Sequence, residues 1–132
     1  MSVTGASNVA LGATHHNWRP DVRRDVQQVL SRFSALSANT YIGHPWPGWD
    51  SVSADFWGPA GRGDPIGVDL SWSAVRFLLR LPGKPLIRHI IVEHSLWTSY
   101  GGWSWWSPAD HTGRLRHVHV TWWPDGPGSV PN

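Results

Sequence analysis

The stretch LRHVHVTWW, residues 115–123, decides the fold. Side chains alternate between the two faces of a β-strand, so this stretch predicts a strand with one polar and one apolar face. The polar face carries His117, His119 and Thr121, and the apolar face carries Val118, Val120 and Trp122. The apolar face is expected to pack on a core, which turns both imidazoles to the other side of the sheet. A His-x-His spacing by itself fits an exposed strand face as well as a metal site.

The rest of the chain predicts two helices and further strands around this one. Apolar residues at helical spacing predict helices over residues 20–36 and 66–81. We expect extended segments at 40–42, at 53–57 and from Trp97, a central strand at 87–94, and a loop over 100–114. This order indicates an α+β fold, a small antiparallel sheet with two main helices. The expected organisation is one domain over residues 17–124, a flexible arm at 1–16 and a flexible tail at 125–132.

Composition narrows the classes of protein and of site. The 132 residues contain no apolar run of the ~20 residues that cross a bilayer, and the N-terminus lacks the layout of a secretory signal. Cysteine is absent, so a metal site has to use imidazole and carboxylate groups. The formal net charge of +2 includes scattered arginines and no basic tract, which argues against nucleic acid as the partner.

Tryptophan is unusually frequent, with 11 in the chain. Trp is seldom wholly buried, so a core of this size is expected to leave several indoles on a surface or in a cleft, although most would pack in the core or at its rim. The Trp-rich loops around residues 46–57 and 97–106 could grip a glycan. They therefore indicate a second class of function, a non-catalytic binding module.

Candidate metal ligands lie upstream of the histidine strand. A reactive zinc site uses about three protein ligands and leaves a position for water. His119 is joined by His44, which follows the first short extended segment, and by Asp55 in the second, with Asp50 as an alternative carboxylate. The preceding strand adds polar groups that could either hydrogen-bond metal-bound imidazoles or be satisfied interior polar groups, namely His89, Glu93 and His94.

Two blocks of sequence together resemble a known zinc peptidase pattern. They are GHPWPGWDSVSADFWG at 43–58 and DHTGRLRHVHVTWW at 110–123. The shared pattern is a His, then an Asp, then a late strand with His-x-His. It is similar to that of the D-alanyl-D-alanine carboxypeptidase-like peptidases, whose superfamily includes lysostaphin-type enzymes and the hedgehog signalling domain. The resemblance covers about residues 20–123. Its His to Asp interval is longer here, which keeps Asp50 open, and Arg116 stands near the place of the family's general base.

The resemblance implies a zinc ion at the face of the sheet, held by His44, Asp55 and His119. The activity it implies is metal-assisted hydrolysis of peptide bonds in bacterial peptidoglycan, as in a cell-wall carboxypeptidase or an endolysin-type endopeptidase. The partner is then a peptidoglycan peptide or another cell-wall polymer. The protein is expected to be a monomer that acts at the bacterial wall, as a phage product or after release by lysis.

The catalytic roles that follow from the resemblance fall on the last block. Asp110 or His111 is expected to be the general base, and His117 to carry a proton or stabilise the developing oxyanion. Members of one superfamily need not share catalysis, so the Trp-rich glycan-binding or cell-wall-binding module, with a structural metal or none, stays as the alternative. A nucleic-acid binder ranks last.

Overall fold

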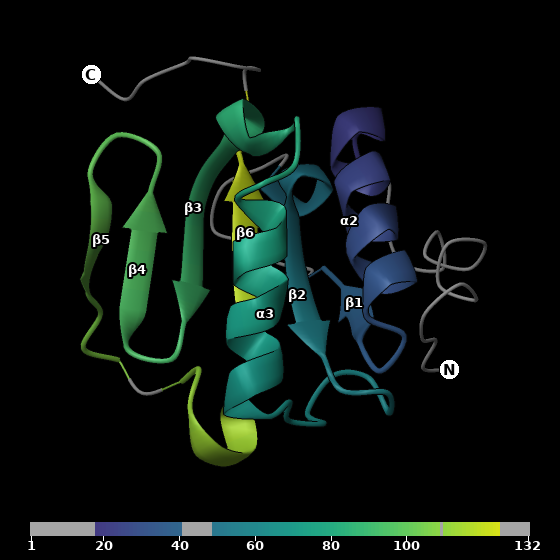
Figure 1. Ribbon diagram of the computed structural model, residues 1–132, viewed down its shortest axis with the longest axis vertical. Coiled ribbons are helices and arrows are strands. Elements are labelled where there is room, and N and C mark those ends of the chain that lie inside the picture. The colour runs from purple at the N-terminus through teal and green to yellow at the C-terminus, as the bar shows by residue number, and fades with distance from the viewer. Residues whose placement is uncertain (1–17, 41–48, 109, 125–132) are drawn as a thin grey trace.

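Residues 18–40, 49–108 and 110–124 are described by a computed structural model of the chain. They form one antiparallel sheet with two helices on one face (Figure 1). The helices are α2 (Pro20–Arg32) and α3 (Val68–Leu78). The strands are β1 (Ser37–Asn39), β2 (Ser53–Trp57), β3 (Ile87–Val92), β4 (Ser95–Thr98), β5 (Gly102–Trp105) and β6 (Val118–Trp122). The predicted class, α+β with an antiparallel sheet and two main helices, is confirmed.

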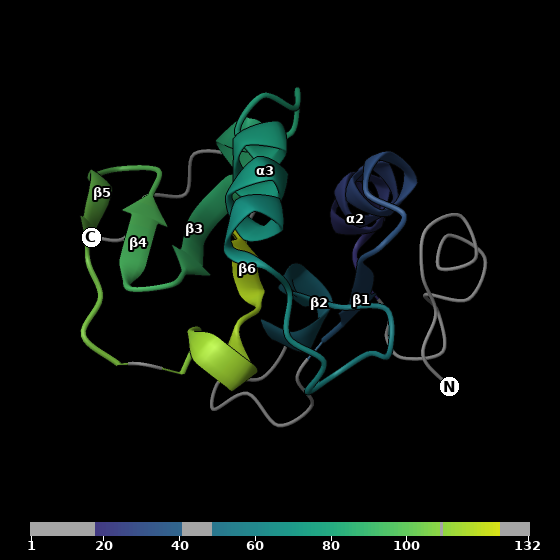
Figure 2. The same cartoon turned by 60° about the horizontal axis from the view of Figure 1, so that its bottom comes forward.

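The order of strands in the sheet is β1-β2-β6-β3-β4-β5. The histidine strand β6 therefore lies inside the sheet, between β2 and β3, and β5 lies at one edge. The strand predicted at 87–94 appears as β3, and it is interior as its two apolar faces indicated. Figure 2 shows α2 and α3 on the same side of the sheet after rotation, while β4 and β5 extend past the helix layer.

The core lies between the helices and one face of the sheet. Val118, Val120 and Trp122 of β6 are fully buried on that face, as their alternation predicts. The helices contribute one apolar stripe each, Val22, Val26, Val29 and Leu30 from α2 and Ala74, Val75 and Leu78 from α3. Each of these Val and Leu side chains contributes roughly 1.5–3 kcal/mol by leaving water. The same alternation places the polar residues of β6 and β2 on the opposite face.

Both helices are shorter than the spacing of apolar residues predicts. The helix expected over 20–36 ends at Arg32, because Phe33 leaves helical geometry with a φ of −124°. Leu36 is nevertheless fully buried and reaches the core from the connection to β1. The helix expected over 66–81 spans Val68–Leu78, and the chain then enters a short 3-10 turn at Lys84–Leu86. Apolar side chains in turns thus extended the periodic pattern beyond each helix.

Two strands at the edges of the sheet differ from the prediction. β5 occupies part of the expected loop over 100–114, and β1, at Ser37–Asn39, is a strand that precedes the extended segment expected at 40–42. Three predictions fall outside the described residues and cannot be compared with the structure. They are the extended segment at residues 41 and 42, the arm at 1–16 and the tail at 125–132. Among the helices that the structure describes, none is long and apolar enough to cross a membrane.

Candidate functional site

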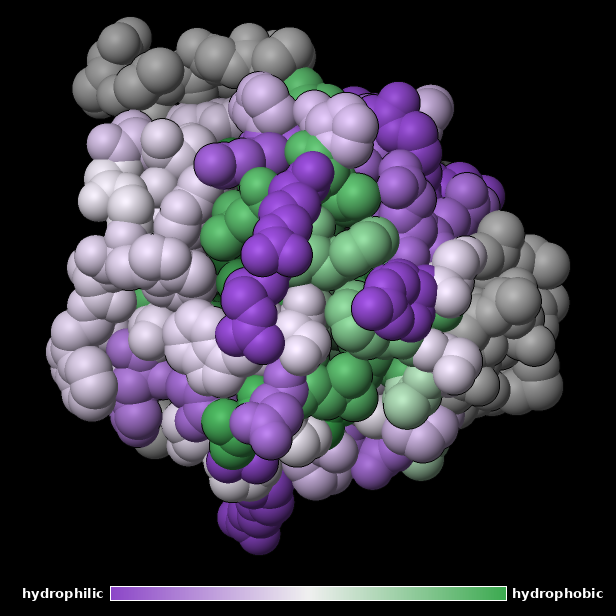
Figure 3. Space-filling view, viewed as in Figure 1, coloured by the Kyte–Doolittle hydropathy of each residue, from purple (hydrophilic) through white to green (hydrophobic). Residues whose placement is uncertain are grey.

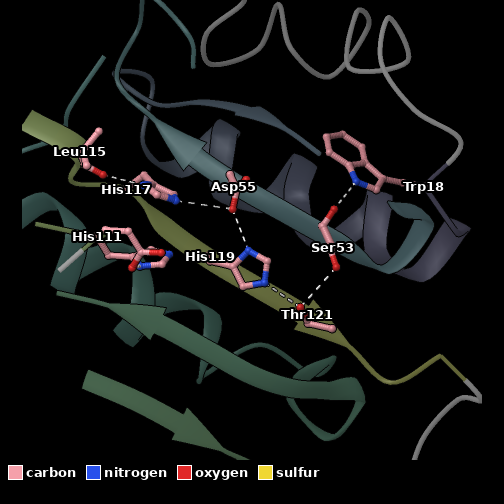
Figure 4. Close-up of polar contacts among 9 residues, drawn as sticks. Trp18, Ser53, Asp55, His111, Leu115, His117, His119 and Thr121 are labelled. Carbon is pink, nitrogen blue, oxygen red and sulfur yellow. Dashed lines mark hydrogen bonds and ion pairs between the residues drawn. The ribbon is translucent and has the colours of Figure 1, made fainter. Parts of the chain in front are cut away.

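Asp55 and His119 face each other across two paired strands on the face of the sheet opposite the helices. The register of β2 against β6 makes them direct partners, so their side chains emerge side by side. His119 Nδ1 lies 2.8 Å from Asp55 Oδ1 (Figure 4). Both side chains are only partly exposed. Two residues that are 64 positions apart in the sequence thus form one charged or hydrogen-bonded pair.

The second ring nitrogen of His119 is held as well. His119 Nε2 lies 2.8 Å from the hydroxyl of Thr121, and that hydroxyl lies 3.3 Å from Ser53 Oγ. The main chain at Ser53 is fixed in turn, because the indole of Trp18 donates a hydrogen bond to its carbonyl at 2.8 Å. A hydroxyl can donate or accept, so Thr121 can support His119 in either tautomer. The imidazole orientation is therefore set from both sides (Figure 4).

His117 lies beside this pair with its ring held between two others. Its ring stacks on Trp57 with 4.0 Å between centroids and 13° between planes, and the His111 ring lies 4.3 Å away. His117 Nδ1 donates to the Leu115 carbonyl at 2.6 Å, since a carbonyl can only accept. In the neutral ring Nε2 then carries no proton. That nitrogen lies 3.8 Å from Asp55 Oδ1.

His111 completes a cluster of three histidines. Its side chain is buried, and His111 Nδ1 lies 2.7 Å from the carboxylate of the more exposed Asp110. The centroid of its ring is 6.4 Å from that of His119. A fourth histidine, His89 of β3, stacks on His119 from the other side at 5.5 Å. The Arg88 guanidinium approaches His89 Nδ1 at 2.7 Å and can only donate, so that nitrogen is an acceptor.

Burial keeps most of these imidazoles neutral. Desolvation, with the charges of His119 and Arg88, lowers the pKa of His89 to about 3. Desolvation also lowers the pKa of His111 to about 4, and it moves the pKa of His117 in the same direction. The three rings are therefore neutral at pH 7, which is the form that binds metals and accepts protons.

The carboxylate at the centre of the cluster stays ionised. Burial by itself would raise the pKa of Asp55, but the hydrogen bond and charge of His119 bring that pKa below its usual value, together with the charges of His117 and His111 once those rings are protonated at low pH. The cluster thus presents one anionic oxygen among several imidazole nitrogens.

A surface hollow of about 460 Å³ gives access to the cluster. Side chains from three parts of the chain line it. The β2 strand and the turn after it contribute Asp55, Trp57, Arg62 and Gly63, and the later segment contributes Asp110, Leu115, His117 and His119. The turn that carries Arg62 contains two glycines with positive φ, Gly61 at 95° and Gly63 at 90°, a conformation that suits glycine. A small polar molecule could therefore reach Asp55, His117 and His119 from solvent.

The structure brings together five of the six site residues that the sequence predicts. These are Asp55, Asp110, His111, His117 and His119. His44 lies outside the described residues. Asp50 belongs to the 3-10 turn Trp49–Val52. Within the described ranges, no three His, Asp or Glu side chains are arranged as a ready metal-binding group, and a zinc site is not shown.

Other polar residues considered from the sequence fall in different places. His89 lies against His119, as a supporting group would. Glu93 instead pairs with Arg116 at 2.8 Å. His94, in the turn between β3 and β4, stacks on Trp105 of β5. Two residues that line the site, Trp57 and Arg62, are not among those predicted from the sequence. Trp57 alternates in phase with Asp55, which is a signal that could have placed it on the same face.

Comparison with known proteins gives no assignment for this site. No family model matches the chain, and neither a curated protein nor a solved structure matches it significantly. The function therefore has to be argued from the arrangement of Asp55 and the histidines.

Proposed function

We propose that the protein is a zinc-dependent hydrolase that cleaves peptide bonds in bacterial peptidoglycan, with His44, Asp55 and His119 as the metal ligands. The observation that carries the proposal is the pairing of Asp55 with His119 on an open sheet face, surrounded by histidines that stay neutral at pH 7. The substrate class comes from the family resemblance of the two sequence blocks at 43–58 and 110–123.

The donor set on the sheet fits zinc. Zinc takes imidazole nitrogen and carboxylate oxygen at ~2.0–2.2 Å, so two of its ligand atoms in a tetrahedral site lie about 3.3 Å apart. Asp55 Oδ1 and His119 Nδ1 lie 2.8 Å apart, so a small outward movement would let both reach one ion. The contact of His119 Nε2 with Thr121 is the support that a metal-bound imidazole normally has. His44 is the third ligand in this proposal.

A zinc ion at this place would acidify a bound water and polarise the carbonyl of the substrate. The chain itself supplies the group that takes the proton. We assign this role to His117 Nε2, which carries no proton in the neutral ring because Nδ1 is occupied by the Leu115 carbonyl. Stacking on Trp57 and on His111 holds the ring in position.

The family resemblance implies Asp110 or His111 as the base and a proton-carrying or stabilising role for His117. The geometry favours the proton-carrying role. A neutral His117 cannot donate from Nε2 to an oxyanion, whereas a His117 that has taken a proton can pass it to the leaving amine. His111 and Asp110 support this step from beside the ring, where Asp110 fixes the orientation of His111.

Zinc content and peptidoglycan hydrolysis, measured together on the full chain, test the proposal. Elemental analysis after exhaustive dialysis should give close to one zinc per chain, and purified sacculi should release free amino groups unless a chelator is present. Asp55→Asn should lose zinc and activity together, while Asp64→Asn, in the turn after β2, should keep both. A protein that neither retains nor regains zinc would refute the metal site, and a zinc-loaded protein that leaves sacculi intact would refute the substrate.

A further inference from the structure

The hairpin of β4 and β5 has a composition unlike the rest of the chain. Residues 95–108, SLWTSYGGWSWWSP, contain no Asp, Glu, Lys or Arg. They contain five aromatic residues and five hydroxyl-bearing Ser or Thr residues in fourteen positions. Aromatic faces with hydroxyl groups and no charge are typical of surfaces that bind neutral polar molecules.

Two indoles of this hairpin emerge on the same side of the edge strand. Trp103 and Trp105 are two positions apart on β5, so they share one face of the sheet. Trp103 pairs with Trp97 of the core, which identifies that face as the helix side. Helix α3 covers only part of this face, where Trp72 meets Trp103, and Trp103 and Trp105 are 45% and 72% exposed. In Figure 3 the surface over β4 and β5 is mostly pale, without the strongly hydrophilic colour seen over α2.

The indole rings of Trp103 and Trp105 are each held by contact with one neighbouring ring and stay partly exposed to solvent. Trp105 stacks on His94 with 4.8 Å between centroids and 12° between planes. His94 is itself fixed, because its Nδ1 donates to the Trp106 carbonyl at 3.0 Å. Trp103 packs against Trp72 of α3 at 5.3 Å. Rings that are already ordered lose little conformational entropy on binding, which favours affinity for a flat ligand.

We propose that Trp103 and Trp105 form a binding surface for a neutral glycan strand. The face of a pyranose ring presents C–H groups that stack on an indole, and its hydroxyl groups can hydrogen-bond Ser95, the register partner of Trp105 on the same face. Nucleic acid is disfavoured, because bases that stack on indoles bring phosphates that need basic side chains, and this hairpin has none. The surface lies on the helix side of the sheet, whereas Asp55 and His119 lie on the other side. The inference goes beyond the proposed hydrolase and does not require a metal.

Calorimetric titration of the full chain with a soluble chito-oligosaccharide, in the presence of a chelator, tests the surface. We expect binding with a Kd below about 1 mM, and a loss of affinity of at least about tenfold in Trp105→Ala. Trp105 is exposed enough for the variant to fold. Val68→Ala truncates another exposed apolar side chain, at the start of α3, and this variant should bind as the unmodified chain does.

Several results would contradict the assignment of Trp103 and Trp105 as a glycan-binding surface. They are the absence of binding, equal affinity in Trp105→Ala, or preference for an oligonucleotide with a steep dependence on salt. Another is a concentration-dependent dimer that Trp105→Ala abolishes without any glycan binding, since it would assign the β5 edge to a second copy of the chain. Asp55→Asn separates this inference from the proposed function, because it should lose hydrolysis and keep glycan binding.

Discussion

At the scale of single residues, the site is organised by which ring nitrogen of each histidine already has a partner. Nδ1 of His117 donates a hydrogen bond to the Leu115 carbonyl, and Nδ1 of His111 donates one to the Asp110 carboxylate. In each neutral ring Nε2 therefore carries no proton. His119 differs, because Asp55 and Thr121 contact its two nitrogens. The three histidines therefore have different capacities although they lie within one cluster.

Replacing His119 and His117 should separate metal binding from turnover. His119→Ala removes a proposed ligand, so zinc per chain should fall from about one to near zero. His117→Phe keeps a ring between Trp57 and His111 but cannot take a proton, so zinc should stay and the hydrolysis rate should fall by about 10²-fold or more. Elemental analysis and rate assays measure both. His94→Ala, a histidine outside the site, is the control, and zinc retention by His119→Ala would contradict the assignment.

Thr121→Val tests whether the hydrogen bond to His119 Nε2 supports the metal. Val has nearly the shape of Thr and removes the hydroxyl, so zinc affinity should fall by roughly 10–100-fold. Competition with a chromophoric chelator gives the affinity. Ser53→Ala removes the more distant hydroxyl, 3.3 Å from Thr121, and should have a smaller effect. Equal affinities in the unmodified chain and Thr121→Val would show that Thr121 only packs.

At the scale of helices and strands, one buried carboxyl ties the helix layer to the sheet. Asp25 of α2 is fully buried and accepts a hydrogen bond from the Trp122 indole of β6 at 3.0 Å. Within the described part of the chain its other oxygen has no hydrogen-bond partner. Desolvation raises the pKa of Asp25 above the ordinary aspartate value of 3.8, in spite of the bond from Trp122. An ionised Asp25 therefore destabilises the fold at neutral pH.

Asp25→Asn should make this cost visible as a dependence on pH. Because the folded-state pKa of Asp25 lies above the unfolded value, the unmodified chain gains stability as pH falls through the folded-state pKa toward 3.8. Asn can still accept the bond from Trp122, and it has no charge to bury. The variant should be the more stable protein at pH 7, with an advantage that shrinks on acidification. Urea unfolding at several pH values gives the two free energies, and a constant difference would contradict the raised pKa.

The same carboxyl leaves no room for a side chain at Gly83, in the turn after α3. A Cβ added to Gly83 would collide with both oxygens of Asp25, although the backbone angles of Gly83 suit any residue. Gly83→Ala should lower the free energy of unfolding by about 1–3 kcal/mol. At Gly67, where an added Cβ meets nothing, Ala should cost less, about 1 kcal/mol or below, because Ala is a poorer N-cap than Gly. Thermal denaturation compares the two variants, and similar melting temperatures would refute the steric explanation.

The strands that could be predicted from the sequence are those whose pattern is local. β6 alternates polar and apolar residues throughout, β2 does so from Ser53 to Phe56, and β3 has the apolar faces of an interior strand. β5 could not be recognised, because its glycine and serine residues are typical of a loop and its pairing with β4 is a tertiary interaction. The pairing of Asp55 with His119 depends in the same way on β2 lying beside β6. No spacing in the sequence contains that register.

At the scale of the whole molecule, the proposed metal would join distant parts of the chain. Asp55 and His119 belong to adjacent strands, and His44 comes from a separate segment. A ligand that binds only the folded state stabilises it by about 4 kcal/mol at a thousandfold excess over Kd. Removing zinc should therefore lower the Tm of the unmodified chain by roughly ten degrees or more. Calorimetry with and without chelator measures the change, which Asp55→Asn should not show.

The position of β6 also sets an order for assembly. Within the described sheet, β1 and β2 form one ribbon and β3, β4 and β5 another, and β6 is the only strand that pairs with both. During synthesis β6 is made after the other strands of the described sheet. Until then β2 in the first ribbon and β3 in the second each have an edge whose backbone groups lack the β6 partner. The pairing of β2 with β6 spans more than sixty residues and is a late, slow event. A ribosome-bound chain from which Trp122 has not yet emerged therefore exposes two unpaired strand edges that can pair with other chains. Chaperones would matter most at this stage of synthesis.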